Sequence, residues 1–128
     1  MAIYLLDTSV AIDAINGKRG RRKLLEQLVE AGEVLACSAM TVAEIYAGIR
    51  PQEIEKTEAL LDGLDHFAVD RDLARYAGLL KNEWAKRGRA LSLPDVTIAA
   101  TALAYKLVLM TDNRKDFPMP GLALYALP

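Results

Sequence analysis

Three acidic residues stand where an α/β protein places its reactive groups. Asp7 directly follows the apolar run at residues 3–6, Glu44 follows the run at residues 34–37, and Asp95 begins a long apolar helix. Short continuous apolar runs are typical of strands buried on both faces of a parallel sheet. Ligands of open α/β sheets bind outside the carboxyl ends of the strands. We therefore expect the three carboxylates to gather at one edge of a sheet.

Each of these acids also has a local explanation as a helix cap. Asp7 can cap the helix that follows it, and Glu44 stands at capping-box spacing from Thr41. Asp95 has the same spacing from Ser92. Capping does not predict that all the acids should meet in space, whereas a parallel topology does.

A cluster of carboxylates indicates a bound cation. Like charges held close together repel and shift their pKa values unless a cation neutralises them. Oxygen ligands with no histidine or cysteine nearby suit Mg²⁺ or Mn²⁺. A fourth acidic position lies among Asp112, Asn113 and Asp116, after the strand expected at residues 107–111. The residues alone leave open whether Asp112 or Asp116 completes the cluster.

Composition limits the class of protein but does not name a partner. A chain of 128 residues predicts one domain, residues 1–128, with a substantial core. The net charge of -1 gives no indication for or against nucleic acid. Cys37 is the only cysteine, so we expect no internal disulfide and a cytoplasmic location. Asp7 interrupts the first apolar run, which predicts neither a signal peptide nor a membrane span. The lone His66 is expected to be structural.

Predicted strands and helices alternate along the whole chain. This order favours a three-layer α/β/α domain with a small, mainly parallel sheet. The strands are expected at residues 3–6, 34–37, 67–69, 107–111 and 122–125, and helices at 9–15, 53–64, 70–87 and from Ser92 onward.

The densest basic run of the chain lies at residues 18–23. Its charged side chains include Arg19, Arg21, Arg22 and Lys23. One interpretation is the solvated start of an amphipathic helix. The other is an edge that contacts the phosphates of a nucleic acid.

Four segments together resemble the PIN-domain nucleases, specifically the VapC-type toxins of toxin–antitoxin pairs. The resemblance covers essentially the whole chain, and the order and spacing of the segments carry it. The segments are residues 6–10, residues 41–45 with Gly48, residues 94–102, and residues 111–113 with Asp116 and Phe117.

The resemblance implies a role for each acid. Residues matching Asp7 and Asp95 hold the divalent ion in this family, and Glu44 matches a further acidic site residue. The family pattern after the last buried strand aligns Thr111, Asn113 and Asp116 and leaves Asp112 at a variable place. Strand alternation agrees, because Thr111 and Asn113 would point to one side and Asp112 to the other. We therefore expect Asp116 to complete the site with support from Asn113 and Thr111, and Thr8 and Ser9 to support Asp7.

The implied function is that of a Mg²⁺- or Mn²⁺-dependent endoribonuclease toxin, working in the cytoplasm by metal-activated water. An acidic site would repel RNA, so the basic side chains of residues 18–23 are candidates to offset this repulsion. The resemblance also implies a homodimer and a cognate antitoxin. Two alternatives stay open. One is an inactive module that binds an antitoxin or nucleic acid. The other is an aspartate-nucleophile phosphatase, which requires a second acid two residues after Asp7, where this chain has Ser9.

Overall fold

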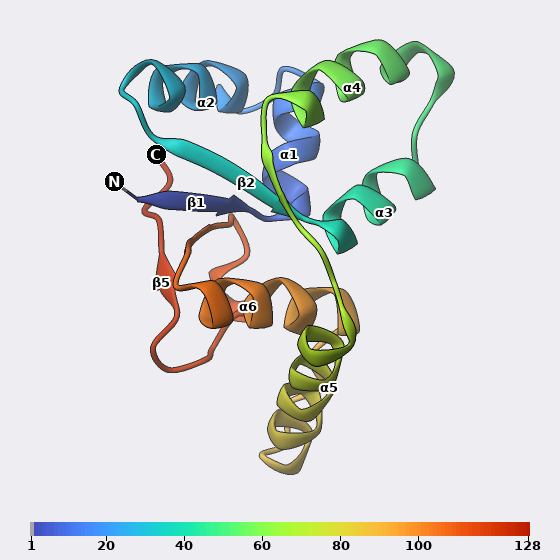
Figure 1. Ribbon diagram of the computed structural model, residues 1–128, viewed down its shortest axis with the longest axis vertical. Coiled ribbons are helices and arrows are strands. Elements are labelled where there is room, and N and C mark those ends of the chain that lie inside the picture. Colours follow the sequence, from blue (N-terminus) through green and yellow to red (C-terminus); the bar gives the residue numbers. More distant parts are fainter. Residues whose placement is uncertain (1) are drawn as a thin grey trace.

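The centre of the fold is a parallel sheet. The computed structural model describes residues 2–128, in which five strands take the order β3-β2-β1-β4-β5 (Figure 1). Each pairing between neighbouring strands is parallel. The strands are β1 (Ile3–Leu6), β2 (Val34–Ser38), β3 (Asp65–Phe67), β4 (Val108–Met110) and β5 (Ala123–Leu124).

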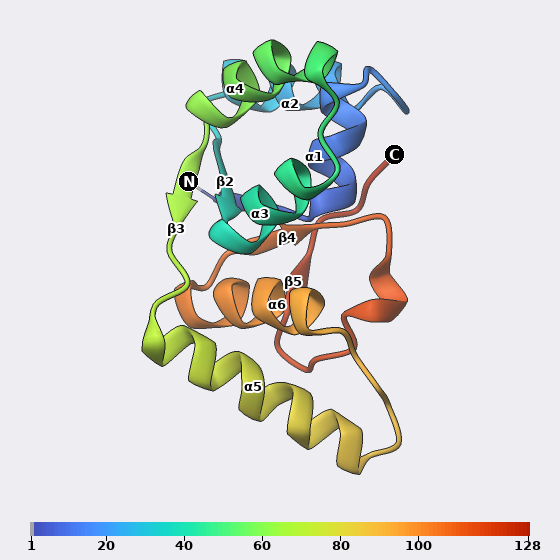
Figure 2. The ribbon, with the colours of Figure 1, turned by 90° about the vertical axis from the view of Figure 1, so that its right-hand side faces the viewer.

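Helices cover both faces of this sheet. One side carries α1, α2 and α4, and the other carries α5 and α6 (Figure 2). The predicted three-layer α/β/α class is therefore confirmed. Within residues 2–128 the helices are α1 (Thr8–Ile15), α2 (Arg21–Glu30), α3 (Ala39–Ala47), α4 (Ile54–Asp62), α5 (Arg71–Lys86) and α6 (Leu93–Tyr105), with 3₁₀ turns η1 (Pro51–Glu53) and η2 (Arg114–Asp116). In the same range, no helix combines the length and apolar character that crossing a membrane requires.

Side chains of the central strand β1 pack into both hydrophobic cores. Leu5 packs into the core formed with α5 and α6, whereas Leu6 packs into the core formed with α1, α2 and α4. Successive side chains of a strand point to opposite faces, so a strand covered on both sides must be apolar at every position. This requirement explains the continuous apolar run that ends at Asp7.

One local prediction was wrong, and one alternative interpretation is excluded. The third strand lies at Asp65–Phe67 rather than at residues 67–69, because it pairs with β2 in the register that sets Ser38 beside Phe67. The capping box of Thr41 and Glu44 does not form. Helix α3 starts earlier, with Ser38 as its cap, and the Ser38 hydroxyl accepts from the Met40 backbone N–H at 3.1 Å.

The strand order reverses at the carboxyl ends of β1 and β4, and we call this edge of the sheet the crevice. From β1 the chain moves to β2 and β3 on one side, and then returns to β4 on the other side of β1. Such reversal points are where open α/β sheets bind ligands. Asp7 follows β1 and Thr111 follows β4, so both residues lie at this crevice.

Candidate metal centre at the ends of β1 and β4

Asp7 lies at the junction between β1 and α1, where it accepts three hydrogen bonds. The Thr8 backbone N–H donates to Oδ1 at 2.8 Å, which makes Asp7 the N-cap of α1. The hydroxyls of Thr111 and Ser9 donate to Oδ2 at 2.7 Å and 3.3 Å. Burial raises the pKa of Asp7, and the nearby charge of Glu44 adds to this shift, whereas the hydrogen bonds oppose it. Asp7 is thus both a cap and a buried, oriented carboxylate.

Glu44 is held by a chain of hydroxyl groups. The Thr8 hydroxyl donates to Glu44 Oε1 at 2.7 Å, and Thr8 Oγ1 lies 3.0 Å from Thr41 Oγ1. A hydroxyl has one hydrogen to donate. Since Thr8 gives its hydrogen to Glu44, the Thr41 hydroxyl must donate to Thr8. Thr41 on α3 thus donates to Thr8 on α1, and Thr8 donates to Glu44 on α3.

Asp95 faces the same crevice from the first turn of α6. Its backbone N–H donates to the Ser92 hydroxyl at 3.1 Å, so Ser92 caps the helix as predicted. Burial raises the pKa of Asp95, and a side-chain hydrogen bond from the Ser92 hydroxyl to the Asp95 carboxyl opposes this shift. The negative charges of Asp7 and Asp116 raise this pKa further. The parallel topology therefore brings these carboxylates within electrostatic reach of one another.

The two acids that the sequence left as alternatives, Asp112 and Asp116, have different surroundings in the loop after β4. Asp112 pairs with Arg21, and Arg21 Nη2 lies 2.7 Å from Asp112 Oδ1. Asp116 lies in η2, and its charge acts on Asp95. The Asn113 backbone N–H donates to the Thr111 hydroxyl at 3.0 Å.

The donor set of the crevice fits a hard divalent cation. None of the ion pairs within residues 2–128 neutralises the acids of the crevice, which are Asp7, Glu44, Asp95 and Asp116. In the same part of the chain, no three acidic, histidine or cysteine side chains form a preassembled metal cage. Mg²⁺ does not need such a cage, because it keeps several waters and is held by one or two carboxylates together with substrate phosphates. Two oxygen donors such as those of Asp7 and Asp95 meet this requirement.

A family model describing the PIN domain matches residues 4–118. The chain belongs to the PIN-domain family. Ribonuclease VapC19 of Mycobacterium tuberculosis is 34% identical over 115 residues, covering 90% of this chain and 92% of that protein. The VapBC2 complex from Rickettsia felis, bound to a DNA fragment from their promoter, has a TM-score of 0.84 at 28% identity and covers 96% and 97% of the two chains. A toxin–antitoxin complex from Klebsiella pneumoniae has a TM-score of 0.76 at 30% identity and covers 96% of each chain. The resemblance to VapC ribonucleases is thus confirmed.

The basic run of this PIN domain is partly committed to internal contacts. Arg21 is only 4% exposed. Arg22 donates to the backbone carbonyls of Ala14 and Ile15 at 3.2 Å and 2.9 Å. Arg19 is exposed at the turn before α2, and Lys23 is exposed on the helix itself. Of the four side chains named for the run, those of Arg19 and Lys23 are exposed and donate no hydrogen bond within residues 2–128, although Arg19 lies 3.7 Å from Asp13 and 3.6 Å from Asp112.

Thr41 is the residue of the site that sequence reasoning missed. It is fully buried, and its hydroxyl is the first donor of the chain that ends at Glu44. A signal was present, because residues three apart on a helix share a face. The capping-box interpretation explained the same spacing of Thr41 and Glu44 as a helix cap.

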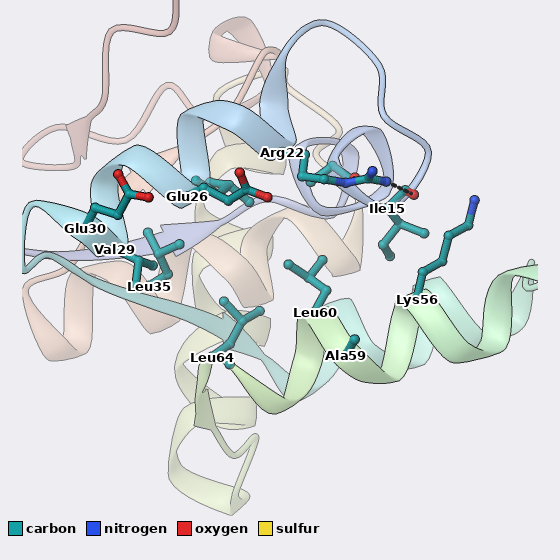
Figure 3. Close-up of a pocket in the computed structure, with 13 residues that line it drawn as sticks. Ile15, Arg22, Glu26, Val29, Glu30, Leu35, Lys56, Ala59, Leu60 and Leu64 are labelled. Carbon is teal, nitrogen blue, oxygen red and sulfur yellow. Dashed lines mark hydrogen bonds between the residues drawn. The ribbon is translucent and has the colours of Figure 1, made fainter.

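A second hollow lies away from the acids, between α1, α2 and α4. It has a volume of about 600 Å³, and its walls are mainly apolar (Figure 3). In Figure 3, Leu60 of α4 and Leu64, which follows this helix, face Val29 of α2 and Leu35 of β2 across the groove. Its charged lining residues are Arg22, Glu26, Glu30 and Lys56.

Proposed function

We propose that this protein is a divalent-metal-dependent endoribonuclease that acts as the toxin of a type II toxin–antitoxin pair. The observation that carries the proposal is the crevice at the ends of β1 and β4, where the charges of several carboxylates act on one another and no ion pair within residues 2–128 neutralises them. The matched relatives support it, because they are ribonucleases and toxin–antitoxin complexes. We propose further that residues 1–128 form a single PIN-like nuclease domain and that it acts in the cytoplasm.

Asp7 and Asp95 would hold the ion, which we propose to be Mg²⁺ or Mn²⁺. When bound, such an ion lowers the pKa of a coordinated water and stabilises negative charge on a phosphate. Thr111 and Ser9 fix the orientation of the Asp7 carboxylate by donating to its Oδ2 atom. Outer hydrogen bonds of this kind set the direction and basicity of a ligand.

Glu44 would take the proton of the attacking water. Its Oε1 atom accepts the Thr8 hydroxyl, which leaves Oε2 as the atom available to the water. Asp116, whose charge acts on Asp95, is the second candidate for this role. A positioned carboxylate that removes a proton is a general base. Hydrolysis by this route leaves a 5′-phosphate and does not use His66, whose ring nitrogens lie against Leu61 O and Cys37 Sγ.

RNA must approach a site with a strong negative charge. Exposed arginine and lysine side chains can offset this repulsion by contacting phosphates. We propose Arg19 and Lys23 for this role, since Arg21 and Arg22 are held by internal contacts.

The two alternative functions have less support. A phosphatase of the aspartate-nucleophile type needs an acid at position 9, and here the Ser9 hydroxyl instead donates to Asp7. An inactive binding module would have no need of the oriented carboxylates, yet Asp7 and Glu44 each keep short hydroxyl hydrogen bonds.

The experiment that tests the proposed function is cleavage of total cellular RNA by the purified protein. We expect discrete fragments with 5′-phosphate ends in Mg²⁺ or Mn²⁺, and none in EDTA. Asp7→Asn should reduce the rate by more than about 100-fold, since losing even an outer-shell partner of a metal ligand costs 10–100-fold. Equal inactivity of wild type and variant in every metal would support the inactive module instead.

We propose that a helix of the cognate antitoxin binds in the apolar groove of Figure 3. Its apolar walls come from α2 and α4, and acidic and basic side chains both line it, as suits an amphipathic helix. We expect Leu60→Asp to weaken antitoxin binding by at least about 30-fold while RNA cleavage persists. The matched control is Ile54→Asp, at an exposed apolar residue of the same helix α4 that lies outside the groove. Equal binding by both variants would place the antitoxin elsewhere.

We also propose a homodimer. Tyr76 and Leu79 on α5 are exposed large apolar side chains, and such side chains are enriched at subunit interfaces when they are clustered. Sedimentation velocity of the purified protein gives the oligomeric state directly.

A further inference from the structure

A buried ion pair joins the start of α2 to the loop after β4. Arg21 Nη2 lies 2.7 Å from Asp112 Oδ1, and the two side chains are only 5% and 15% exposed. Arg21 Nη1 also donates to the backbone carbonyl of Pro128 at 3.4 Å. The guanidinium therefore ties together three segments that are far apart in the sequence.

Asp112 stands between the two residues that orient the Asp7 carboxylate. Thr111, just before it, donates its hydroxyl to Asp7 Oδ2 at 2.7 Å. Asn113, just after it, donates its backbone N–H to the Thr111 hydroxyl oxygen at 3.0 Å. Asp112 is thus flanked by both residues of this hydrogen-bond chain, so holding its side chain restrains the segment that carries the Thr111 hydroxyl.

Stability alone gives little reason for this ion pair. Arg21 Nε and Asp112 Oδ2 are both buried, and neither has a hydrogen-bond partner within residues 2–128. Arg19 Nη1 lies 3.6 Å from Asp112 Oδ2, too far for a hydrogen bond. A buried pair repays its desolvation only when the remaining polar atoms are satisfied, and its best-supported use is to specify one conformation.

We propose that Arg21 and Asp112 are positioning residues for the candidate metal centre. They hold the loop after β4 so that the Thr111 hydroxyl meets Asp7 and keeps its carboxylate directed into the crevice. This inference rests on the proposed function for its effect on catalysis. The proposal gives Arg21, a member of the basic run, a role inside the protein. It also makes Asp112 a residue that holds the loop after β4 and not a metal ligand.

The test compares Asp112→Asn and Arg21→Met with Glu53→Gln. Glu53 is a matched control, because it is a carboxylate with 10% exposure that pairs with an arginine at 2.9 Å, outside the loop after β4. Each variant is examined for thermal unfolding, hydrogen exchange of the Asn113 amide, Mn²⁺ affinity, and kcat and KM on RNA. Asp112→Asn keeps the size of the side chain, so it carries the test if Arg21→Met does not fold.

We expect Asp112→Asn and Arg21→Met to speed exchange of the Asn113 amide and to lower kcat by about tenfold or more with little change in KM, because small misplacements of reacting groups are costly. Arg21→Lys, which keeps the charge, should recover part of kcat. Glu53→Gln should alter only the unfolding temperature.

Two results would overturn the inference. One is a loss of stability in all three variants with unchanged Asn113 exchange and kcat, which would make the pair merely stabilising. The other is a raised KM with unchanged kcat in Arg21→Met, which would make Arg21 an RNA contact. If the wild type cleaves no RNA, the proposed function fails, whereas amide exchange and Mn²⁺ affinity still decide whether the pair positions the loop.

Discussion

The carboxylates in two regions of this protein are treated in opposite ways. At the turn before α4, Glu53 pairs with Arg50 at 2.9 Å, and hydrogen bonds from Arg50 hold the pKa of Glu53 down at about 2. At the ends of β1 and β4, Asp7 and Asp95 have no basic partner among the described ion pairs, and burial raises both pKa values. The chain thus neutralises a carboxylate where only structure is required. At the crevice the neutralising charge must come from outside the protein.

Among the substitutions that test this comparison, Thr111→Val is expected to have the largest effect on metal affinity or activity. The substitution removes the hydroxyl that donates to Asp7 Oδ2 but nearly keeps the shape of the side chain. Loss of such an outer partner costs about 10–100-fold in metal affinity or activity, and we expect a decrease in this range.

Thr101→Val is the control for this substitution. Thr101 is also fully buried, but its hydroxyl donates to the Thr97 carbonyl within α6. It should keep full activity. Equal losses in both variants would show that the Thr111 hydroxyl has no special link to the site, and would weaken the contrast between the two groups of acids.

A smaller effect is expected on the stability of the metal-free protein. A carboxyl whose pKa is raised by folding contributes stability below its unfolded pKa, and that stability is lost as the pH rises through the folded pKa. Asp7 and Asp95 have this sign, so Asp7→Asn should unfold at a higher temperature than wild type at pH 7 in EDTA. Saturating Mn²⁺ should stabilise wild type, by about 2.7 kcal/mol at 100 times its Kd, and should do little for the variant. A variant that is less stable than wild type in EDTA would show that Asp7 acts chiefly as a cap.

The smallest effect is expected from Glu53→Gln, which should lower the unfolding temperature at pH 7, whereas Asp7→Asn should raise it. Folding lowers the pKa of Glu53 to about 2, so its contribution is present above the unfolded value near 4.5 and is lost as the pH falls toward 2. The substitution should therefore lower the unfolding temperature at pH 7 and have less effect near pH 2. Thermal unfolding scanned across this range measures the difference. A pH-independent change would mean that Glu53 contributes through packing alone.

The strands and the acids at their ends could be predicted because burial on both faces leaves a plain pattern. Continuous apolar runs marked β1 and β4, and Asp7 came directly after the first. The pairing of Arg21 with Asp112 could not be predicted, since it joins positions 91 residues apart and depends on how α2 meets the loop after β4. The groove between α2 and α4 was missed for a similar reason. Hydrophobic spacing defines the inward face of a helix but not the gap left between two helices.

The most direct test of the account is Mn²⁺ titration of the purified protein by calorimetry, with Asp95→Asn compared against Glu53→Gln. The account predicts that wild type and Glu53→Gln bind the ion alike, and that Asp95→Asn loses most of the affinity while remaining folded. Unchanged affinity in Asp95→Asn would contradict the central claim that the carboxylates at the ends of β1 and β4 hold the catalytic ion.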